Sequence, residues 1–415
     1  MKYVALAATA LSFVGFGFLA DTPAHIAEGL KRISVEPAIL ITDYVAVGGM
    51  GAAFINAGVL MLLSVALLYL LKVNISGIYV ASAFLMGSFG LFGKNLINVW
   101  PIILGVFIYS RLRRESFKNY VHIAFLTTGI APIVTEFWFV IPLPPWVKLI
   151  SGLLVGVSIG ILITPLSSNM MRLHKGFNLY NVGFSVGMLG TIYASLLKSY
   201  GYSAGSRLIW STGNNRLLGI FLCSLFVCMI IAGILAEKHA IKRLKEVFQR
   251  PGASGGPCFV ELDGFETVLI NMGINGLVAL GYILLVGGDL NGPTAGGILT
   301  VAGFGGYGKH AKNIAPIFIG VLIGGLTGTW NIDDPGILIA ALFGTALAPI
   351  AGHYGWFWGV VAGYINSSVV TNASFLHGWM NLYNTGFSAG IVASVMVPLL
   401  DAFWKRKKPQ AEPDR

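Results

Sequence analysis

The stretch FGLFGKNLINVWPIILGV at residues 89–106 returns as FGGYGKHAKNIAPIFIGV at residues 304–321. Aligned without a gap, the two copies keep glycines, a lysine, an asparagine and a proline in the same order. The matched pairs are Phe89 with Phe304, Gly93 with Gly308, Lys94 with Lys309, Asn98 with Asn313, Pro101 with Pro316 and Gly105 with Gly320. Shared apolar composition alone does not keep such residues in step, so the chain contains an internal duplication.

Further matches extend the duplication over most of each half. Ile55-Asn56 returns as Ile270-Asn271, and NLYNVGFSVG at 178–187 returns as NLYNTGFSAG at 381–390. A histidine precedes each copy of the second motif, His174 in one half and His377 in the other. We place the first repeat at 1–215 and the second at 216–415, which begins with the apolar run 216–236 and the basic linker 237–256.

Composition assigns the chain to the helical membrane proteins. Of its 415 residues, 55% are hydrophobic and only 11% are charged, whereas a typical soluble domain carries about 25% charged residues. Apolar runs recur at about the 20 residues that cross a bilayer core. The net charge of +10 arises from basic residues in short loops beside apolar runs, which is typical of membrane proteins and does not indicate nucleic-acid binding.

The apolar runs predict seven membrane segments in each half. Residues 3–20 also resemble a cleaved signal peptide, but residues 216–236 would then have no counterpart, so we expect the first helix to be retained. The predicted segments are 3–20, 50–71, 75–93, 96–112, 119–141, 147–166 and 177–197, followed by 216–236, 266–287, 291–308, 313–329, 336–354, 356–371 and 382–404.

If all seven segments of each half span the membrane, this odd number places the second half upside down relative to the first. Basic loops test this orientation because Lys and Arg collect on the cytoplasmic side. Loops 111–118, 172–175, 237–250 and 405–408 are basic, whereas 329–336 and 375–378 contain no Lys or Arg. This distribution predicts an inverted repeat in the inner membrane, with both termini cytoplasmic and a site near the midplane between the halves.

Glycine-rich, polar sequence marks the same place in both halves, at 73–95 and 289–313. We expect broken or re-entrant helices there, because non-helical backbone is tolerated in a membrane only where it faces protein or a water-filled path. Close packing of helices through small residues is the alternative. These segments supply four candidates for the solute path: Asn74, Ser76, Asn291 and Thr294.

Lysines and amides supply the other candidates. Lys94 and Lys309 follow the glycines, with Asn98 and Asn313 one helical turn further on. A lysine at such a place either serves a function or extends to the membrane interface. The NLYN motifs add amides that either bind a polar solute or form interhelical hydrogen bonds. These amides are Asn178, Asn181, Asn381 and Asn384.

Few ionisable residues are placed to couple transport to an ion gradient. Glu136 aligns with His353 four residues after a matched Ala-Pro, and Asp289 precedes a glycine-rich segment. These three are candidate coupling residues, although an ordinary charge at the edge of a loop gives the same pattern. The sequence has no zinc motif, nucleophile elbow or phosphate loop, and its three cysteines lack metal-ligand spacing. It therefore predicts neither an enzyme nor a bound metal or cofactor.

The whole chain resembles an uncharacterised family of prokaryotic polytopic membrane proteins known as a domain of unknown function. The resemblance is carried by GPTAGGILTVAGFGGYGKHAKNI at 292–314 and FNLYNVGFSVG at 177–187. It implies a membrane protein but no particular activity.

Each half is also similar to the halves of urea transporters, which are inverted repeats around a narrow pore. Asn74-Ile75-Ser76-Gly77 and Asn291-Gly292-Pro293-Thr294 resemble the start of a urea-transporter half. LYNVGFSVG and LYNTGFSAG resemble its Gly-Tyr-Asn-Gly-x-Leu-x-Gly segment. The Leu-Pro-x-Phe-Asn pore signature of that family is absent, and Asn178 or Asn381 stands where that family usually has Gly. The resemblance implies an inverted-repeat fold and a homotrimer.

Together these observations predict an all-α inner-membrane transporter or channel that moves a small polar or ionic solute between two inverted repeats. Lys94 and Lys309 would favour an anion if they face the path. A proton- or sodium-coupled transporter of a small carboxylate or amino acid is one alternative, and a membrane-embedded enzyme or scaffold is another. The expected partners are the solute, the lipid bilayer and further copies of the chain, but no nucleic acid.

Overall fold

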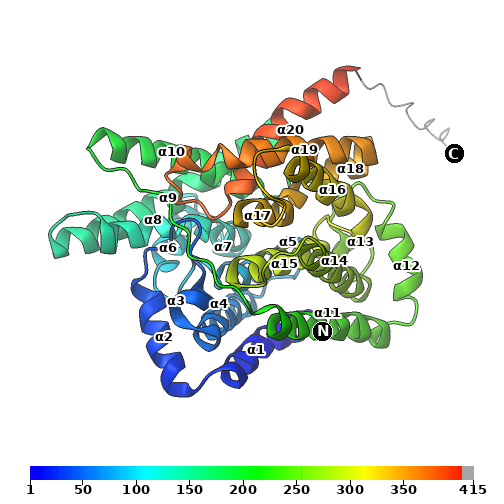
Figure 1. Cartoon of the computed structure of the whole chain (residues 1–415), viewed down its shortest axis with the longest axis horizontal. Helices are drawn as coiled ribbons and strands as arrows, with labels where there is room; N and C mark the ends of the chain where they lie inside the picture. Colours follow the sequence, from blue (N-terminus) through cyan, green and yellow to red (C-terminus); the bar gives the residue numbers. More distant parts are fainter. Residues whose placement is uncertain (254, 404–415) are drawn as a thin grey trace.

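The computed structural model describes residues 1–253 and 255–403, and this part of the chain is helical and contains no strand (Figure 1). The basic tail 405–408 lies outside the described residues. The helices of the first half are α1 (Lys2–Ala20), α2 (Pro23–Val35), α3 (Tyr44–Gly48), α4 (Met50–Leu70), α5 (Gly77–Phe89), α6 (Trp100–Leu112), α7 (Val121–Thr127), α8 (Pro132–Thr135), α9 (Pro145–Leu173) and α10 (Asn181–Ser199). Those of the second half are α11 (Asn215–Ala236), α12 (Ala240–Val247), α13 (Phe259–Leu262), α14 (Phe265–Leu285), α15 (Gly292–Gly303), α16 (Ala311–Thr327), α17 (Pro335–Gly344), α18 (Ala348–Tyr354), α19 (Trp356–Thr371) and α20 (Asn384–Phe403).

Seven helices in the described residues are long and apolar enough to cross a membrane, and a bent pair gives an eighth if it counts as one span. The seven are α1, α4, α9, α11, α14, the joined run of α17 and α18, and α20. The bent pair covers 121–130 and 132–140, with an angle of 51° between its parts. A chain with this many long apolar helices is a multi-pass helical membrane protein, as its composition predicts.

Several of the other predicted segments form helices too short to cross a bilayer core. Helices α5 and α6 have 13 residues each and α15 has 12, so each covers about 20 Å at the rise of an α-helix. After α5 the chain turns through Gly93, whose φ of 108° is open to glycine without steric cost. The broken helices expected at 73–95 and 289–313 are therefore present in the structure.

Corresponding helices of the two halves pack in the same pairs. Helix α1 lies against α4 as α11 lies against α14, and α6 lies against α9 as α16 lies against α19. Glycines allow α6 to lie close to α9, and α16 to lie close to α19. A Cβ on Gly105 would lie 2.2 Å from the carbonyl oxygen of Val157, and one on Gly320 would lie 2.1 Å from that of Val360. These repeated contacts agree with the duplication, while the inverted orientation of the halves stays a prediction.

The two short helices α5 and α15 lie side by side near the centre of the molecule (Figure 1). They run in opposite directions, because the start of each lies beside the end of the other. A Cβ on Gly77 would touch the carbonyl oxygen of Gly306, and one on Gly292 would touch that of Leu91. Position 77 matches 292 and position 91 matches 306, so the contact between the halves is reciprocal.

The first helix and the linker also have defined places. Residues 3–20 lie in α1, where Leu6 and Phe13 are buried. The linker contains α12, which packs against α14. Retention of the first helix in the cell and the repeat boundary after residue 215 stay predictions.

Candidate functional site

A matched pair of asparagines holds the backbone of the two broken segments. The side-chain amide of Asn56 on α4 donates to the carbonyl oxygens of Gly90 at 2.7 Å and Lys94 at 2.9 Å. In the second half, Asn271 on α14 donates to the carbonyl oxygens of Gly305 at 2.9 Å and Lys309 at 2.8 Å. These bonds satisfy carbonyls that the interrupted helices leave free inside the protein.

The predicted path residues Asn98 and Asn313 bond the backbone at matched places in the two halves. Asn98 Nδ2 donates to the Gly93 carbonyl oxygen at 2.9 Å, and Asn313 Nδ2 donates to that of Gly308 at 3.0 Å. Their side-chain oxygens accept from the backbone of residues 95 and 310, both at 2.9 Å. The two amides hold the turn after each broken helix.

The matched lysines are fully buried and lie against aromatic rings. Lys309 Nζ donates to Tyr180 Oη at 2.5 Å and Thr345 Oγ1 at 2.6 Å, and it lies 5.2 Å from the centre of the Phe304 ring. Lys94 has poorer partners, which are the Phe125 carbonyl oxygen at 3.2 Å and the sulfur of Met86 at 3.6 Å. Among the described residues neither lysine forms an ion pair. Two lysine amino groups therefore lie inside the protein without a carboxylate beside them.

The NLYN motifs form the junctions before α10 and α20. Asn178 Oδ1 accepts from the Tyr180 backbone at 2.9 Å, and Asn381 Oδ1 accepts from that of Tyr383 at 3.0 Å. The side-chain oxygen of the last asparagine of each motif accepts from Nε2 of the preceding histidine, Asn181 from His174 at 2.9 Å and Asn384 from His377 at 3.0 Å. The histidines thus orient these amides.

Contacts between the two motifs are reciprocal. A Cβ on Gly183 would meet the Tyr383 ring at 2.8 Å, and one on Gly386 would meet Tyr180 at 3.1 Å. The tyrosine rings lie 6.0 Å apart, centre to centre. Reciprocal contact of equivalent residues is what an approximate two-fold axis produces. The two motifs therefore meet at the approximate two-fold axis between the halves.

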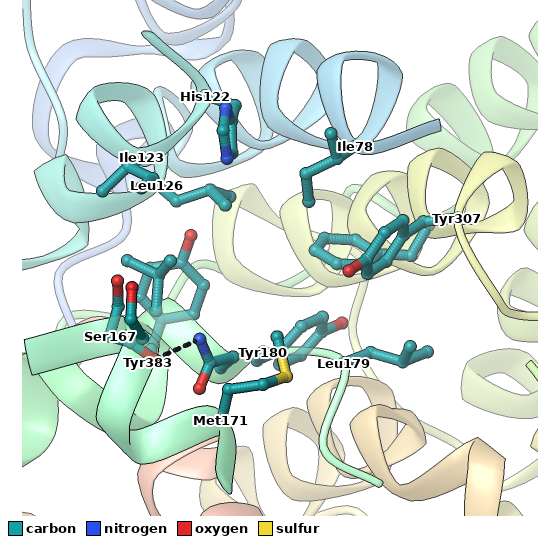
Figure 2. Close-up of a pocket in the computed structure, with 15 residues that line it drawn as sticks. Ile78, His122, Ile123, Leu126, Ser167, Met171, Leu179, Tyr180, Tyr307 and Tyr383 are labelled. Carbon is teal, nitrogen blue, oxygen red and sulfur yellow. Dashed lines mark hydrogen bonds between the residues drawn. The ribbon is translucent and has the colours of Figure 1, made fainter. Parts of the chain in front are cut away.

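A cavity of about 290 Å³, here called cavity A, lies against the first motif (Figure 2). One wall is made by α7 with His122, and another by the end of α9 and the start of α10. The second half closes it with Phe304, Tyr307 and Tyr383. Figure 2 shows His122 directed into this space from one side and Tyr383 from the other. None of the described residues that line cavity A is acidic.

A second cavity of about 300 Å³, here called cavity B, lies against the other motif. Much of its lining repeats that of cavity A position by position. The matched pairs are Ser167 with Val370, Ser168 with Thr371, Met171 with Ser374, Leu179 with Leu382, Asn181 with Asn384, Val182 with Thr385, and His122 with Ile339. The structure thus brings the predicted path residues Asn181 and Asn384 to equivalent places in two separate cavities.

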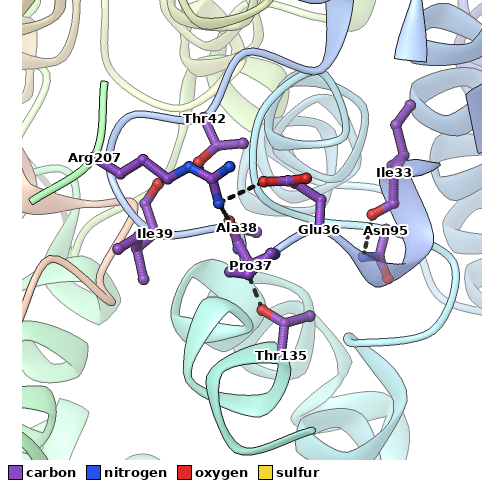
Figure 3. Close-up of polar contacts among 9 residues, drawn as sticks. All are labelled: Ile33, Glu36, Pro37, Ala38, Ile39, Thr42, Asn95, Thr135 and Arg207. Atoms are coloured by element: carbon purple, nitrogen blue, oxygen red, sulfur yellow. Dashed lines mark hydrogen bonds and ion pairs between the residues drawn. The ribbon is translucent and has the colours of Figure 1, made fainter. Parts of the chain in front are cut away.

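Two extended segments, 36–43 and 202–211, border cavity B through Leu40, Ile41 and Arg207. Their backbones pair, with the Ile209 amide donating to the Ile41 carbonyl oxygen at 2.9 Å. The Arg207 guanidinium forms an ion pair with Glu36 at 2.5 Å (Figure 3). Nearby, the Ala38 amide donates to Thr135 Oγ1 at 3.4 Å. The bond from Ala38 to Thr135 fastens segment 36–43 to the bent pair of helices.

The predicted residues at the starts of the broken helices are not among the described residues that line either cavity. Asn74 is exposed and Ser76 is half-buried. Asn291 and Thr294 are buried and bond each other as the cap of α15, with the Thr294 amide 3.1 Å from Asn291 Oδ1. Asp43 Oδ1 accepts from the Gly292 amide at 3.0 Å, so the N-terminus of α15 already has a carboxyl partner.

The three candidate coupling residues are also dispersed. Glu136 is buried and accepts a hydrogen bond from the Tyr202 hydroxyl. The His353 ring packs 5.3 Å from that of Phe177, and Asp289 is half-buried before α15. None of them is among the described residues that line cavity A or cavity B.

Sequence reasoning missed two residues that face cavity A, His122 and Tyr383. His122 was overlooked because its matched position carries Ile339, so it belongs to no repeated pattern. A histidine within the apolar run 121–126 is nevertheless a signal in a membrane protein. Tyr383 lies within the second NLYN motif, but its place in cavity A depends on the approach of the second half to α7.

Comparison with known proteins identifies the family of this chain. A family model described as a protein of unknown function (DUF1576) matches residues 22–199 and 236–402. The chain belongs to this family. The prediction of an uncharacterised family is confirmed, and both broken segments and both NLYN motifs of this DUF1576 protein lie within the matched residues. No curated protein and no solved structure matches the chain, so the likeness to urea transporters stays a prediction.

Proposed function

We propose that this protein is a transporter that moves a small polar or ionic solute across the inner membrane, along a path that joins cavities A and B. One observation carries the proposal. Equivalent residues of the two halves line two separate cavities, and a buried layer with Tyr180, Tyr383 and the two lysines lies at the reciprocal contact between the halves.

The relation between the halves supports opposite openings for the two cavities. The antiparallel contact of α5 with α15 and the reciprocal contacts of the NLYN motifs are those of an approximate two-fold axis. An axis in the membrane plane would turn one half upside down, as the distribution of basic loops also suggests. Cavity A, near the basic loop 172–175, would then open to the cytoplasm, and cavity B, near 375–378, to the outside.

The buried centre favours alternating access over a permanently open channel. In transporters built from inverted repeats, one half moves against the other around a site near the membrane midplane. Here Tyr180 and Tyr383 are almost completely buried, at 2% and 1% exposure, where the two NLYN motifs meet. A movement of the halves that parts these rings would complete the path.

Blocking either cavity tests the path. Ser168→Trp and Thr371→Trp place a large ring in cavity A and cavity B from matched, exposed positions. Each is expected to reduce solute entry into proteoliposomes to the rate of protein-free vesicles. The measurement is light scattering after mixing with sodium acetate, sodium butyrate, glycine, urea or glycerol.

The neighbouring residues provide matched controls. Asn169 and Asn372 are exposed and follow directly after the blocked positions, so Asn169→Trp and Asn372→Trp should leave the rate unchanged. Transport through these cavities is contradicted if both cavity variants conduct as well as their controls. It is equally contradicted if the unaltered protein speeds the entry of none of the five solutes.

A further inference from the structure

Cavity A contains polar groups whose bonding capacity the protein does not use. Tyr383 is 1% exposed, and its hydroxyl has no hydrogen-bond partner among the described residues. The Nδ1 atom of His122 is likewise buried and unpartnered within the described part of the chain. Both side chains line the same cavity from opposite sides (Figure 2). A buried polar group without a partner is costly, and a bound ligand would remove that cost.

The hydrogen-bond donors around the cavity favour a negative ligand. Lys309 lies directly behind the wall, where its amino group donates to the hydroxyl of Tyr180, a residue that lines cavity A. The described lining contains no carboxylate that would attract a cation. A phenol hydroxyl that donates to an anionic oxygen forms one of the stronger hydrogen bonds in proteins.

The rest of the lining is apolar. Ile123, Leu126, Met171 and Leu179 face the same space, so a fully hydrated inorganic anion would leave much of the wall without a matching surface. The volume of about 290 Å³ lies at the lower end of ligand pockets. A ligand with one charged group and a short hydrocarbon chain fits both the polar and the apolar part.

We propose that cavity A binds a small aliphatic carboxylate, with its anionic group between Tyr383 and His122 and its hydrocarbon chain against Leu126, Met171 and Leu179. This inference rests on the proposed transport function, because it names the class of solute that enters the path. It adds Tyr383 and His122 as the residues that select the anion.

Isothermal titration calorimetry of the purified protein in detergent tests the proposal with butyrate, its uncharged isostere butyramide and the cation butylamine. Butyrate is expected to bind at least about tenfold more tightly than butyramide, since hydrogen bonds to charged groups exceed those to neutral ones. Affinity should rise by about fourfold for each methylene from acetate to butyrate as apolar surface is buried.

Tyr383→Phe removes only the unpartnered hydroxyl, so the variant should fold as stably as the parent and bind butyrate about tenfold or more weakly. Tyr282→Phe is the matched control, because Tyr282 also has a buried hydroxyl without a described partner but does not line cavity A. His122→Ile installs the residue found at the matched position 339 and should weaken butyrate binding while sparing butyramide.

Equal or tighter binding of butyramide or butylamine would overturn the carboxylate assignment, and unchanged butyrate binding in Tyr383→Phe would overturn the assigned site. The binding proposal and the transport proposal can be contradicted independently of each other. Butyrate that binds through Tyr383 without entering proteoliposomes leaves this site in place and removes the transport proposal. Entry of another solute without butyrate binding leaves transport in place and removes the carboxylate.

Discussion

Asn56→Leu is expected to lower the free energy of unfolding by about 2–6 kcal/mol. Its amide serves the carbonyl oxygens of both Gly90 and Lys94, and each buried carbonyl left without its donor costs about 1–3 kcal/mol. Leucine has a similar size but cannot donate, so the broken segment after α5 loses its support. Unfolding of the purified protein in mixed detergent micelles, followed by circular dichroism, measures the change.

The second half contains an internal comparison for this prediction. Asn271 bonds Gly305 and Lys309, but Asn275 also donates to the Lys309 carbonyl oxygen, at 3.0 Å. Asn271→Leu therefore leaves one carbonyl without a donor and should cost about 1–3 kcal/mol, about half the loss at Asn56. Equal losses at the two positions, or no loss at Asn56, would contradict the assigned role of these amides.

Gly320→Ala is expected to destabilise the protein by about 3 kcal/mol, the upper end of the range for overpacking. The added Cβ would lie 2.1 Å from the Val360 carbonyl oxygen, which belongs to the backbone of α19 and has little freedom to move. Gly105→Ala creates the same clash in the first half, at 2.2 Å from the Val157 oxygen. The same unfolding assay reports both losses.

Gly281→Ala is the control for the glycine prediction. Nothing lies within 4 Å of a Cβ at position 281 on α14, so the change should be neutral or add about 0.5–1 kcal/mol through helix propensity. If Gly320→Ala is as stable as Gly281→Ala, helices α16 and α19 do not pack as closely as described.

The fold was predictable where both halves carry the same signal. Composition identified a multi-pass membrane protein, and the paired glycine-rich runs located the broken helices α5 and α15. The roles of Asn56 and Asn271 were not predictable, although their match was visible. Their carbonyl partners lie 34 and 38 residues further along the chain, and only the packing of α4 on α5 and of α14 on α15 brings them together.

The candidate site was predictable only in part. Asn181 and Asn384 line the cavities, but most of the other selected amides bond the backbone, because a broken helix leaves carbonyls and amides that need partners. Tyr383 and His122 come from different halves and face each other only after folding. Comparison of the two halves does not reveal His122, because the matched position carries Ile339.

Labelling from the two sides of the membrane tests the central claim most directly. Single cysteines at Ser168 in cavity A and Thr371 in cavity B are introduced after Cys223, Cys228 and Cys258 become serine. Serine at 258 keeps an acceptor for the Gly77 amide, which now bonds the Cys258 sulfur at 3.0 Å. A membrane-impermeant maleimide should label Thr371→Cys in intact cells and Ser168→Cys only in inverted vesicles. Labelling of both from the same side would contradict an inverted pair of halves with cavities that open to opposite faces.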